Sequence, residues 1–84
     1  MYKVKVYVTL RENVLDPQGN AVKGALHSLS YHEVQDVRIG KFMELTVEKS
    51  ERDIDALVKD MCEKLLANTV IEDYRYEIEE VVVQ

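Results

Sequence analysis

Three stretches of the chain alternate between apolar and polar residues, which is the period of a half-buried β-strand. Residues 2–10 place one set of side chains on a core face, namely Val4, Val6, Val8 and Leu10. Residues 70–80 alternate in the same way, with Tyr74, Tyr76 and Ile78 inward. Residues 34–47 hold two strand-like halves with Gly40-Lys41 between them, and their core face would be Val37, Ile39, Met43, Leu45 and Val47. Because a short turn between two such halves is typical of a β-hairpin, the pattern predicts four strands.

Two other segments repeat apolar residues at helical spacing. The first follows Asp16-Pro17, a good N-cap followed by a good first helical residue, and its stripe is Ala21, Val22, Ala25, Leu26 and Leu29. The second follows Ser50 and Asp53, which resemble a capping box, and its stripe is Ile54, Leu57, Val58, Met61, Cys62, Leu65 and Leu66. We expect Asn68 to end this helix in the left-handed conformation.

The predicted order β-α-β-β-α-β is the split βαβ arrangement of an α+β, ferredoxin-like fold. In that arrangement a four-stranded antiparallel sheet carries two helices on one face, and the first and last strands lie side by side. Lys3 and Lys5 would then oppose Glu77 and Glu79 on the open face. With 84 residues, the chain is the size of a single domain, spanning residues 1–84.

The composition narrows the class of protein. At 46% apolar and 32% charged residues, the chain has an ordinary globular composition. Its formal net charge of −5 argues against nucleic acid as a partner. No apolar run is long enough for a membrane span, and the N-terminus lacks the basic and then hydrophobic segments of a signal peptide. The single cysteine, Cys62, excludes an internal disulfide and lies on the apolar stripe of a helix. We therefore expect a cytoplasmic protein with neither a nucleic-acid nor a membrane partner.

Residues with catalytic potential do not cluster in the sequence. His27 and His32 lie near the end of a helix without further metal ligands at suitable spacing, and no phosphate-binding or nucleophile motif occurs. An acylphosphatase-like enzyme of this fold would use an arginine after the first strand, a place that Arg11 occupies, but the glycine-rich cradle is missing. On the open face, Tyr7 and Phe42 are apolar exceptions, which favours a role in an oligomer interface.

Gly19 is unusual because glycine in the first turn of a helix weakens it. A glycine at such a place indicates that something comes close, which is either a partner, a phosphate at the helix N-terminus or a tightly packed neighbouring strand. The structural alternative is close internal packing or a slack turn.

Three segments resemble the characteristic stretches of the PurS family, the small subunit of phosphoribosylformylglycinamidine synthase. They are VLDPQGNAV at residues 14–22, VRIGKFMEL at residues 37–45 and LLANTVIEDY at residues 65–74. The chain departs from the family at Thr69, where proline is frequent, which makes that turn less rigid.

The resemblance implies a subunit without an active site of its own, acting in the fourth step of de novo purine biosynthesis. It would bridge a glutaminase subunit and a large synthetase subunit and support the passage of ammonia between them, as a homodimer or homotetramer. ATP and Mg²⁺ would be used by the synthetase subunit, and no cofactor would be bound by this one. The alternative is a free-standing regulatory domain that binds a small molecule.

In such a subunit, two sets of residues are candidates for partner contact. The first is the helix start, Asp16, Pro17, Gln18 and Gly19, and the second is the turn before the third predicted strand, Arg38, Gly40 and Lys41. For both sets the alternative is purely structural, because a helix cap and a hairpin turn would use the same residues.

Overall fold

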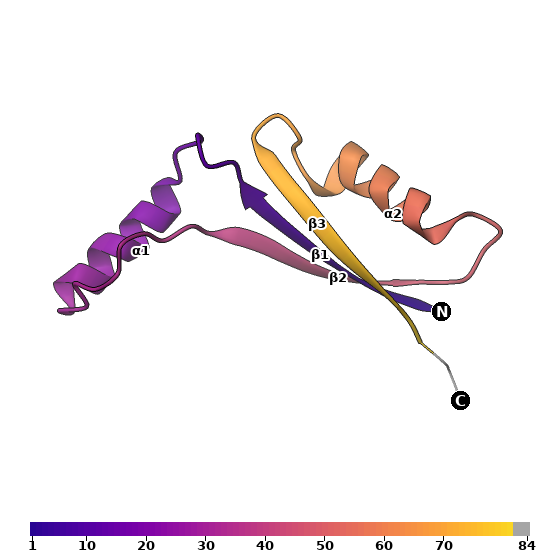
Figure 1. Cartoon of the computed structure of the whole chain (residues 1–84), viewed down its shortest axis with the longest axis horizontal. Coiled ribbons are helices and arrows are strands. Elements are labelled where there is room, and N and C mark those ends of the chain that lie inside the picture. The colour runs from indigo at the N-terminus through magenta and orange to yellow at the C-terminus, as the bar shows by residue number, and fades with distance from the viewer. Residues whose placement is uncertain (82–84) are drawn as a thin grey trace.

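The computed structural model describes residues 1–81, which form an antiparallel sheet with a helix after each of its first two strands (Figure 1). The elements in chain order are β1 (Tyr2–Leu10), α1 (Pro17–Ser28), β2 (Gly40–Val47), α2 (Ile54–Met61) and β3 (Glu72–Glu80). A π-helical turn, η1 (Cys62–Leu66), follows α2 directly. The α+β class and the two helices agree with the sequence pattern.

The strand order in the sheet is β2-β1-β3, so the first and last strands are neighbours as predicted. In the register, Lys3 lies opposite Glu79 and Lys5 lies opposite Glu77. The alternation of β1 is also confirmed, because Val4, Val6 and Val8 are all buried. The central strand therefore supplies the middle of the hydrophobic core.

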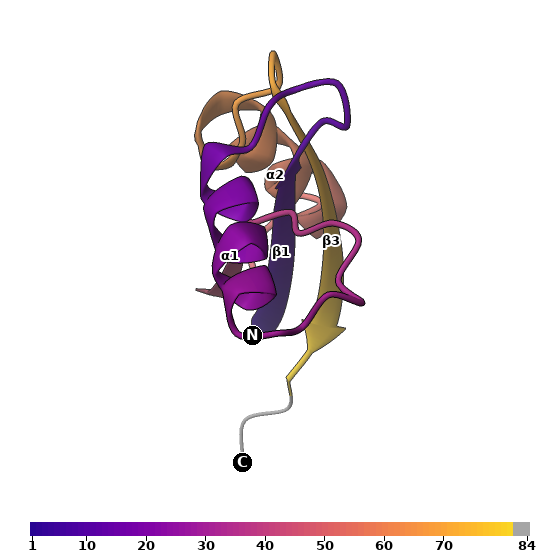
Figure 2. The same cartoon turned by 90° about the vertical axis from the view of Figure 1, so that its left-hand side faces the viewer.

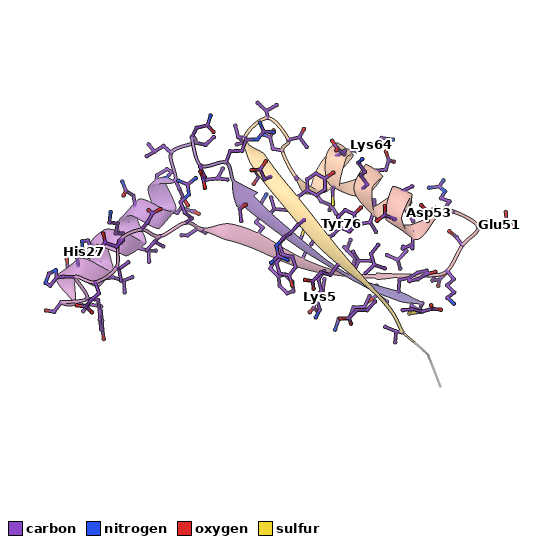
Figure 3. All side chains as sticks on the ribbon, in the orientation of Figure 1. Lys5, His27, Glu51, Asp53, Lys64 and Tyr76 are labelled. Carbon is purple, nitrogen blue, oxygen red and sulfur yellow. The ribbon has the colours of Figure 1, made fainter. Side chains whose placement is uncertain are left out.

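α2 and the following turn η1 cover one face of the sheet and complete this core with Val58 and Cys62 respectively. From β3, Tyr74, Tyr76 and Ile78 pack against it, as the sequence predicts. Figure 3 shows the side chain of Tyr76 between the sheet and α2, whereas Lys5 extends from the opposite face. The sheet thus has one covered face and one open face.

The predicted strand over residues 34–39 is wrong, and the sheet of the described residues has three strands instead of four. The segment is irregular, and the backbone N–H of Ile39 donates to the carboxylate of Asp16 instead of to a strand. A hairpin at Gly40 therefore does not form, and β2 begins at that residue. Of the C-terminal valines predicted to extend the last strand, Val81 follows β3 and Val82 and Val83 lie outside the described residues.

α1 does not pack on the sheet, contrary to the prediction of two helices on one face. It lies beyond the end of the sheet, and residues 31–39 run beside it on their way back to β2 (Figures 1 and 2). No residue of α1 belongs to the hydrophobic core of residues 1–81. The apolar stripe of α1 is consequently left without a sheet of its own chain beneath it.

The second helix differs from its prediction in its caps and its last turn. Asp53, not Ser50, is the N-cap, and its side chain accepts from the N–H of Ala56 at 3.3 Å. The π turn rotates Leu65 away from the core, so that 83% of this side chain is exposed. Asn68 does not adopt a positive φ, and its side chain accepts from Val70 N–H at 3.2 Å instead.

Candidate functional site

Asp16 connects the start of α1 to the segment that precedes β2. One carboxylate oxygen accepts from the backbone N–H of Gly19 at 2.9 Å, and the other accepts from the N–H of Ile39 at 2.7 Å. These two backbone donors, that of Ile39 first, hold the pKa of the buried Asp16 below its ordinary value. The predicted N-cap is confirmed, and the same residue also fixes a segment 23 residues away.

Gly19 has a neighbour in the same chain that explains its lack of a side chain. A Cβ atom at this position would lie 2.2 Å from the carbonyl oxygen of Val37 and 2.8 Å from Oδ2 of Asp16. Of the alternatives that the sequence leaves open, close internal packing is therefore present. A partner contact by Pro17 and Gln18, which are exposed beside it, stays a prediction.

Arg38 also links the segment before β2 to the loop before α1. Its Nη2 donates to the carbonyl oxygens of Arg11 at 2.8 Å and Val14 at 2.9 Å, in the loop between β1 and α1. We refer to Asp16, Gly19, Arg38 and Ile39 together as the clasp. The clasp ties the β1–α1 loop to the α1–β2 connection, and so it sets the direction in which α1 leaves the sheet.

Gly40 and Lys41, the other predicted contact residues, lie at the first positions of β2. A Cβ on Gly40 would lie 2.5 Å from the carbonyl oxygen of Val8, so this glycine also permits a close approach of two strands. Lys41 Nζ lies 3.4 Å from a carboxylate oxygen of Glu72 on β3. Both residues thus have structural partners, and their contact with another subunit stays a prediction.

The open face of the sheet carries a row of two aromatic side chains and one arginine, one from each strand. Phe42, Tyr7 and Arg75 are in register on β2, β1 and β3. The rings of Tyr7 and Phe42 are 5.1 Å apart, and the guanidinium of Arg75 lies 3.9 Å from the centre of the Tyr7 ring. Phe42 is 54% exposed, as the sequence pattern indicates. Arg75 is an addition that sequence reasoning missed, although its register with Tyr7 could have identified it.

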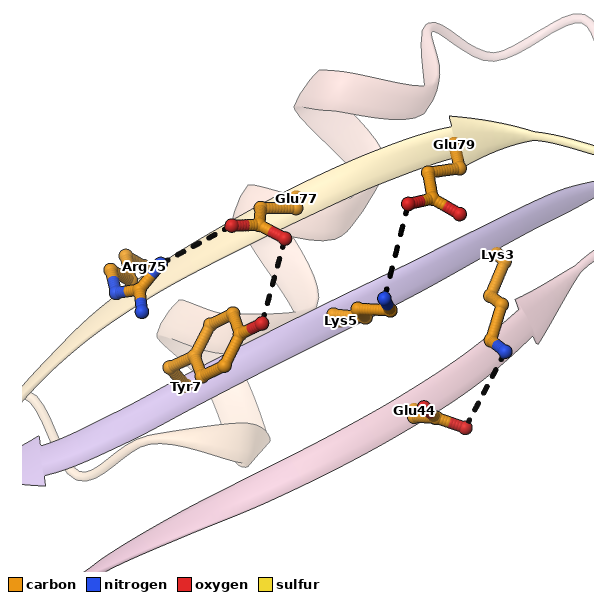
Figure 4. Close-up of polar contacts among 7 residues, drawn as sticks. All are labelled: Lys3, Lys5, Tyr7, Glu44, Arg75, Glu77 and Glu79. Atoms are coloured by element: carbon orange, nitrogen blue, oxygen red, sulfur yellow. Dashed lines mark hydrogen bonds and ion pairs between the residues drawn. The ribbon is translucent and has the colours of Figure 1, made fainter.

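Around this row, acidic and basic side chains alternate and balance one another (Figure 4). Lys3 lies 3.8 Å from Glu44, and Lys5 lies 3.9 Å from Glu79. Arg75 lies 3.4 Å from Glu77 on the same strand. Each pair is exposed and contributes little stability, but together they leave this face without a net charge in a chain of net charge −5. A neutral face with an aromatic centre is suited to contact with protein.

The side chains that the sequence offers for metal binding or catalysis have other surroundings in residues 1–81. No group of three or more potential ligands in this part of the chain could hold a metal ion. Arg11, the residue that an acylphosphatase-like enzyme would use, instead donates to the carbonyl of Thr69 and pairs with Asp73 at 3.4 Å. Burial raises the pKa of the Cys62 thiol, which disfavours the nucleophilic thiolate.

No helix of residues 1–81 has the length and apolar composition needed to cross a membrane.

Comparison with known proteins finds a matching family and several similar proteins. Residues 3–80 match the family model described as PurS, phosphoribosylformylglycinamidine (FGAM) synthase. The chain is 80% identical, over the full length of both, to the PurS subunit of this synthase from Bacillus subtilis strain 168. A PurS subunit from a Synechocystis strain is 51% identical over 92% of this chain and 78% of its own.

Solved structures agree with these sequence matches. A B. subtilis PurS crystal structure, 80% identical, superimposes with a TM-score of 0.91 over 95% of this chain and 100% of its own. A chain of a Thermotoga maritima structure described as PurLQS, 30% identical, gives a TM-score of 0.79 over 93% of this chain and 96% of its own.

Proposed function

Because the chain belongs to the PurS family, the small subunits of the FGAM synthase of purine biosynthesis, we propose that it bridges the glutaminase and synthetase subunits of that enzyme. The observation that carries the proposal is the similarity to a chain of the T. maritima PurLQS structure over almost the whole of both chains. In this role the subunit contributes surfaces instead of reacting groups. It binds no cofactor of its own, while the synthetase subunit uses ATP and Mg²⁺.

The surfaces of the chain fit a bridging subunit. The clasp fixes the loops at one end of the sheet, so that the exposed Pro17 and Gln18 are held on a rigid support. The open face offers the neutral row of Phe42, Tyr7 and Arg75. Two separate surfaces are what a protein needs in order to hold two larger partners at a fixed distance.

By keeping those partners together, the subunit supports the transfer of ammonia from the glutaminase to the synthetase in the cytoplasm. It also associates with itself, as a homodimer or homotetramer. Exposed apolar side chains on the open face and on α1, among them Phe42, Val22 and Leu29, support self-association, because a soluble monomer seldom leaves large apolar patches in water.

The deciding experiment measures formation of formylglycinamidine ribonucleotide by the purified glutaminase and synthetase, with and without this chain. We expect the glutamine-driven rate to depend on the chain and the ammonia-driven rate to change little, because added ammonia needs no transfer between subunits. If neither rate responds, the bridging role is wrong, and binding of small metabolites becomes the hypothesis to test.

A matched pair of variants locates the partner surface in the same assay. Gln18→Arg alters an exposed predicted contact residue in the first turn of α1, and Asn20→Arg adds the same charge on another side of that turn. We expect Gln18→Arg alone to lower the glutamine-driven rate. Equal rates for the two variants would remove the helix start from the partner surface.

A further inference from the structure

The segment that leads from η1 into β3 presents two large apolar side chains to solvent. The π turn of η1 directs Leu65 outward, and Val70 lies in the turn that follows; these side chains are 83% and 79% exposed. We refer to these two residues as the apolar pair. Neither belongs to the hydrophobic core of residues 1–81. Because π turns within helices are frequent at functional sites, the pair is a candidate for contact with another molecule.

Hydrogen bonds hold the backbone of the turn at residues 67–71 in one shape, with Asn68 at their centre. The carbonyl oxygen of Asn68 accepts from the N–H groups of Ile71 at 3.1 Å and Glu72 at 2.7 Å. Its side chain accepts from Val70 N–H at 3.2 Å, and its own N–H donates to the carboxylate of Glu72 at 2.7 Å. Val70 is therefore displayed on a rigid support, which loses little conformational entropy when a partner binds.

A hollow of about 450 Å³ opens beside this turn. Its lining comes from the β1–α1 loop, η1, the turn and the start of β3, and consists of Arg11, Glu63, Thr69, Glu72, Asp73 and Tyr74. Each residue of the apolar pair lies within two positions of a lining residue in the sequence. Hollows of this size hold whole small molecules, so this one has room for a long side chain of a partner.

One of the three carboxylates in the lining lacks a cationic partner within residues 1–81. Asp73 lies 3.4 Å from Nε of Arg11. Glu72 lies 3.4 Å from Nζ of Lys41. Glu63 instead accepts from a tyrosine hydroxyl at 2.9 Å, which leaves its charge uncompensated. The hollow is therefore negative, and a lysine or arginine side chain of a partner would complement it.

Arg11 joins this hollow to the clasp. Its Nη2 donates to the carbonyl oxygen of Thr69, and its backbone N–H donates to that of Ile71 at 2.9 Å. Its own carbonyl oxygen accepts from Arg38 of the clasp at 2.8 Å. The turn and the β1–α1 loop thus lie side by side at the end of the sheet from which α1 leaves (Figure 1). The hollow and the exposed helix start consequently share one rigid support.

The charge of the hollow favours a different protein over a second copy of this chain. A two-fold contact of this surface with itself would bring Glu63 of one copy toward Glu63 of the other, and like charges across an interface are unfavourable. A segment with a cationic side chain beside an apolar one matches both features of the surface. The cationic group would neutralise Glu63, and the apolar group would cover Leu65 and Val70.

We propose that the hollow and the apolar pair dock such a segment of one larger subunit of the synthase, with its lysine or arginine bound to Glu63. This inference rests on the bridging role in the proposed function and specifies one of the surfaces that the role requires. The surface is additional to the predicted contacts at the helix start and before β2, and it lies beside the first of them.

The test is direct binding of the fluorescently labelled chain to the purified synthetase and glutaminase, each alone and both together, measured by sedimentation. Glu63→Gln removes the charge but keeps an acceptor for the tyrosine hydroxyl. Glu51→Gln removes the same charge from the loop between β2 and α2, at the far end of α2 from the hollow (Figure 3), and is the matched control.

We expect Glu63→Gln to raise the dissociation constant for one larger subunit about tenfold or more, and Glu51→Gln to leave it unchanged. The wild-type dissociation constant should also rise more steeply with sodium chloride than that of Glu63→Gln, because salt screens the ion pair. A purely structural role of Glu63 would not produce this difference in salt dependence. Wild-type affinity and salt dependence in Glu63→Gln would overturn the proposal.

A second set of variants tests the apolar pair. Leu65→Ala and Val70→Ala each remove an exposed side chain, so both should keep the urea-unfolding midpoint of the parent chain. Lys64→Ala is the control, because it shortens the side chain next to Leu65, which pairs with Asp60 at 3.1 Å. We expect each variant of the pair to weaken binding about fivefold or more, and Lys64→Ala not to weaken it. Unchanged affinity in both would contradict the docking site.

These measurements concern binding and not FGAM formation. A chain that binds through Glu63 but fails to stimulate the glutamine-driven rate would contradict the bridging role alone. A wild-type chain that stimulates this rate, with Glu63→Gln binding equally well, would overturn the docking site alone. A wild-type chain that binds neither larger subunit would overturn both. If Glu63→Gln changes the mass of the chain on its own, the hollow belongs to a contact between copies, and the proposal is wrong.

Discussion

The carboxylate of Asp16 holds the backbone N–H of Ile39 at 2.7 Å, and through this one bond the start of a helix is attached to the start of a strand. Asp53 offers an internal comparison, because it caps α2 through a single bond of 3.3 Å and attaches nothing else. We expect Asp16→Asn to lower the midpoint of urea unfolding clearly more than Asp53→Asn. Equal shifts would show that the bond to Ile39 adds nothing to the cap.

The same carboxylate makes stability depend on pH. Since the pKa of Asp16 is lowered in the folded state, its contribution is complete above the ordinary value of 3.8 and is lost as the pH falls through the folded value. The wild type should therefore lose more stability than Asp16→Asn between pH 5 and acid. Parallel pH profiles for the two proteins, measured by urea unfolding, would contradict this assignment.

Two glycines of α1 should respond to alanine in opposite directions. At Gly19 a methyl group would meet the carbonyl oxygen of Val37, and we expect Gly19→Ala to destabilise the fold by about 1–3 kcal/mol. At Gly24 there is open space, so Gly24→Ala should stabilise the fold by about 0.5–1 kcal/mol through the higher helix propensity of alanine. Chemical unfolding measures both, and a neutral Gly19→Ala would return that glycine to the partner-contact hypothesis.

Tyr74 should ionise at a higher pH than an ordinary tyrosine. Its hydrogen bond to the carboxylate of Glu63 raises its pKa to about 12 from an ordinary 10.0. A raised pKa means that the contribution of this group to stability is complete below pH 10 and is lost as the pH rises through about 12. Ultraviolet titration of the tyrosine hydroxyls of the wild type should show one group that ionises at this higher pH. Glu63→Gln should move it toward 10, and an unshifted titration would exclude the bond.

Cys62 should be chemically silent until the protein unfolds. The thiol is fully buried and its pKa is raised, so a thiol reagent at pH 8 should react with it only through opening of the structure. Cys62→Ser should destabilise the fold by about 1–3 kcal/mol, because it buries a hydroxyl without a partner. Rapid labelling of the native protein would show that α2 does not cover the sheet as described.

Phe42 provides the test of the open face. If the row of Phe42, Tyr7 and Arg75 lies in an interface between copies, Phe42→Glu should lower the mass in analytical ultracentrifugation. Thr46→Glu controls for the added charge, because Thr46 lies on the same face of β2 but four residues from Phe42. An assembly that both variants leave intact would remove the open face from self-association and leave it to other partners.

Local patterns predicted both helices and the strands β1 and β3, although they missed the N-cap of α2 and the conformation of Asn68. The alternation of β1 and β3, the N-cap at Asp16 and the outward position of Phe42 were all visible in the sequence. The family, too, was recognisable from three short segments, and the match over residues 3–80 confirms it.

The sequence pattern failed where the structure depends on a contact between distant residues. Val37 and Ile39 alternate like a strand, yet Asp16 and Arg38 hold this segment at the start of α1 instead. The stripe of α1 indicated a helix with one apolar side, but a pattern does not specify which sheet, or which copy of the chain, covers that side. Arg75 was missed for a similar reason, because its contact with Tyr7 exists only in the register of two strands.

The separation of α1 from its own sheet also bears on how much of the protein a cell must contain. If the helix is buried only against a second copy, folding and association become one equilibrium, and thermal stability rises with the concentration of the chain. A dilute subunit would then unfold and be degraded, while a concentrated one would persist. The direction of a single helix would in this way couple the lifetime of the protein to its own abundance.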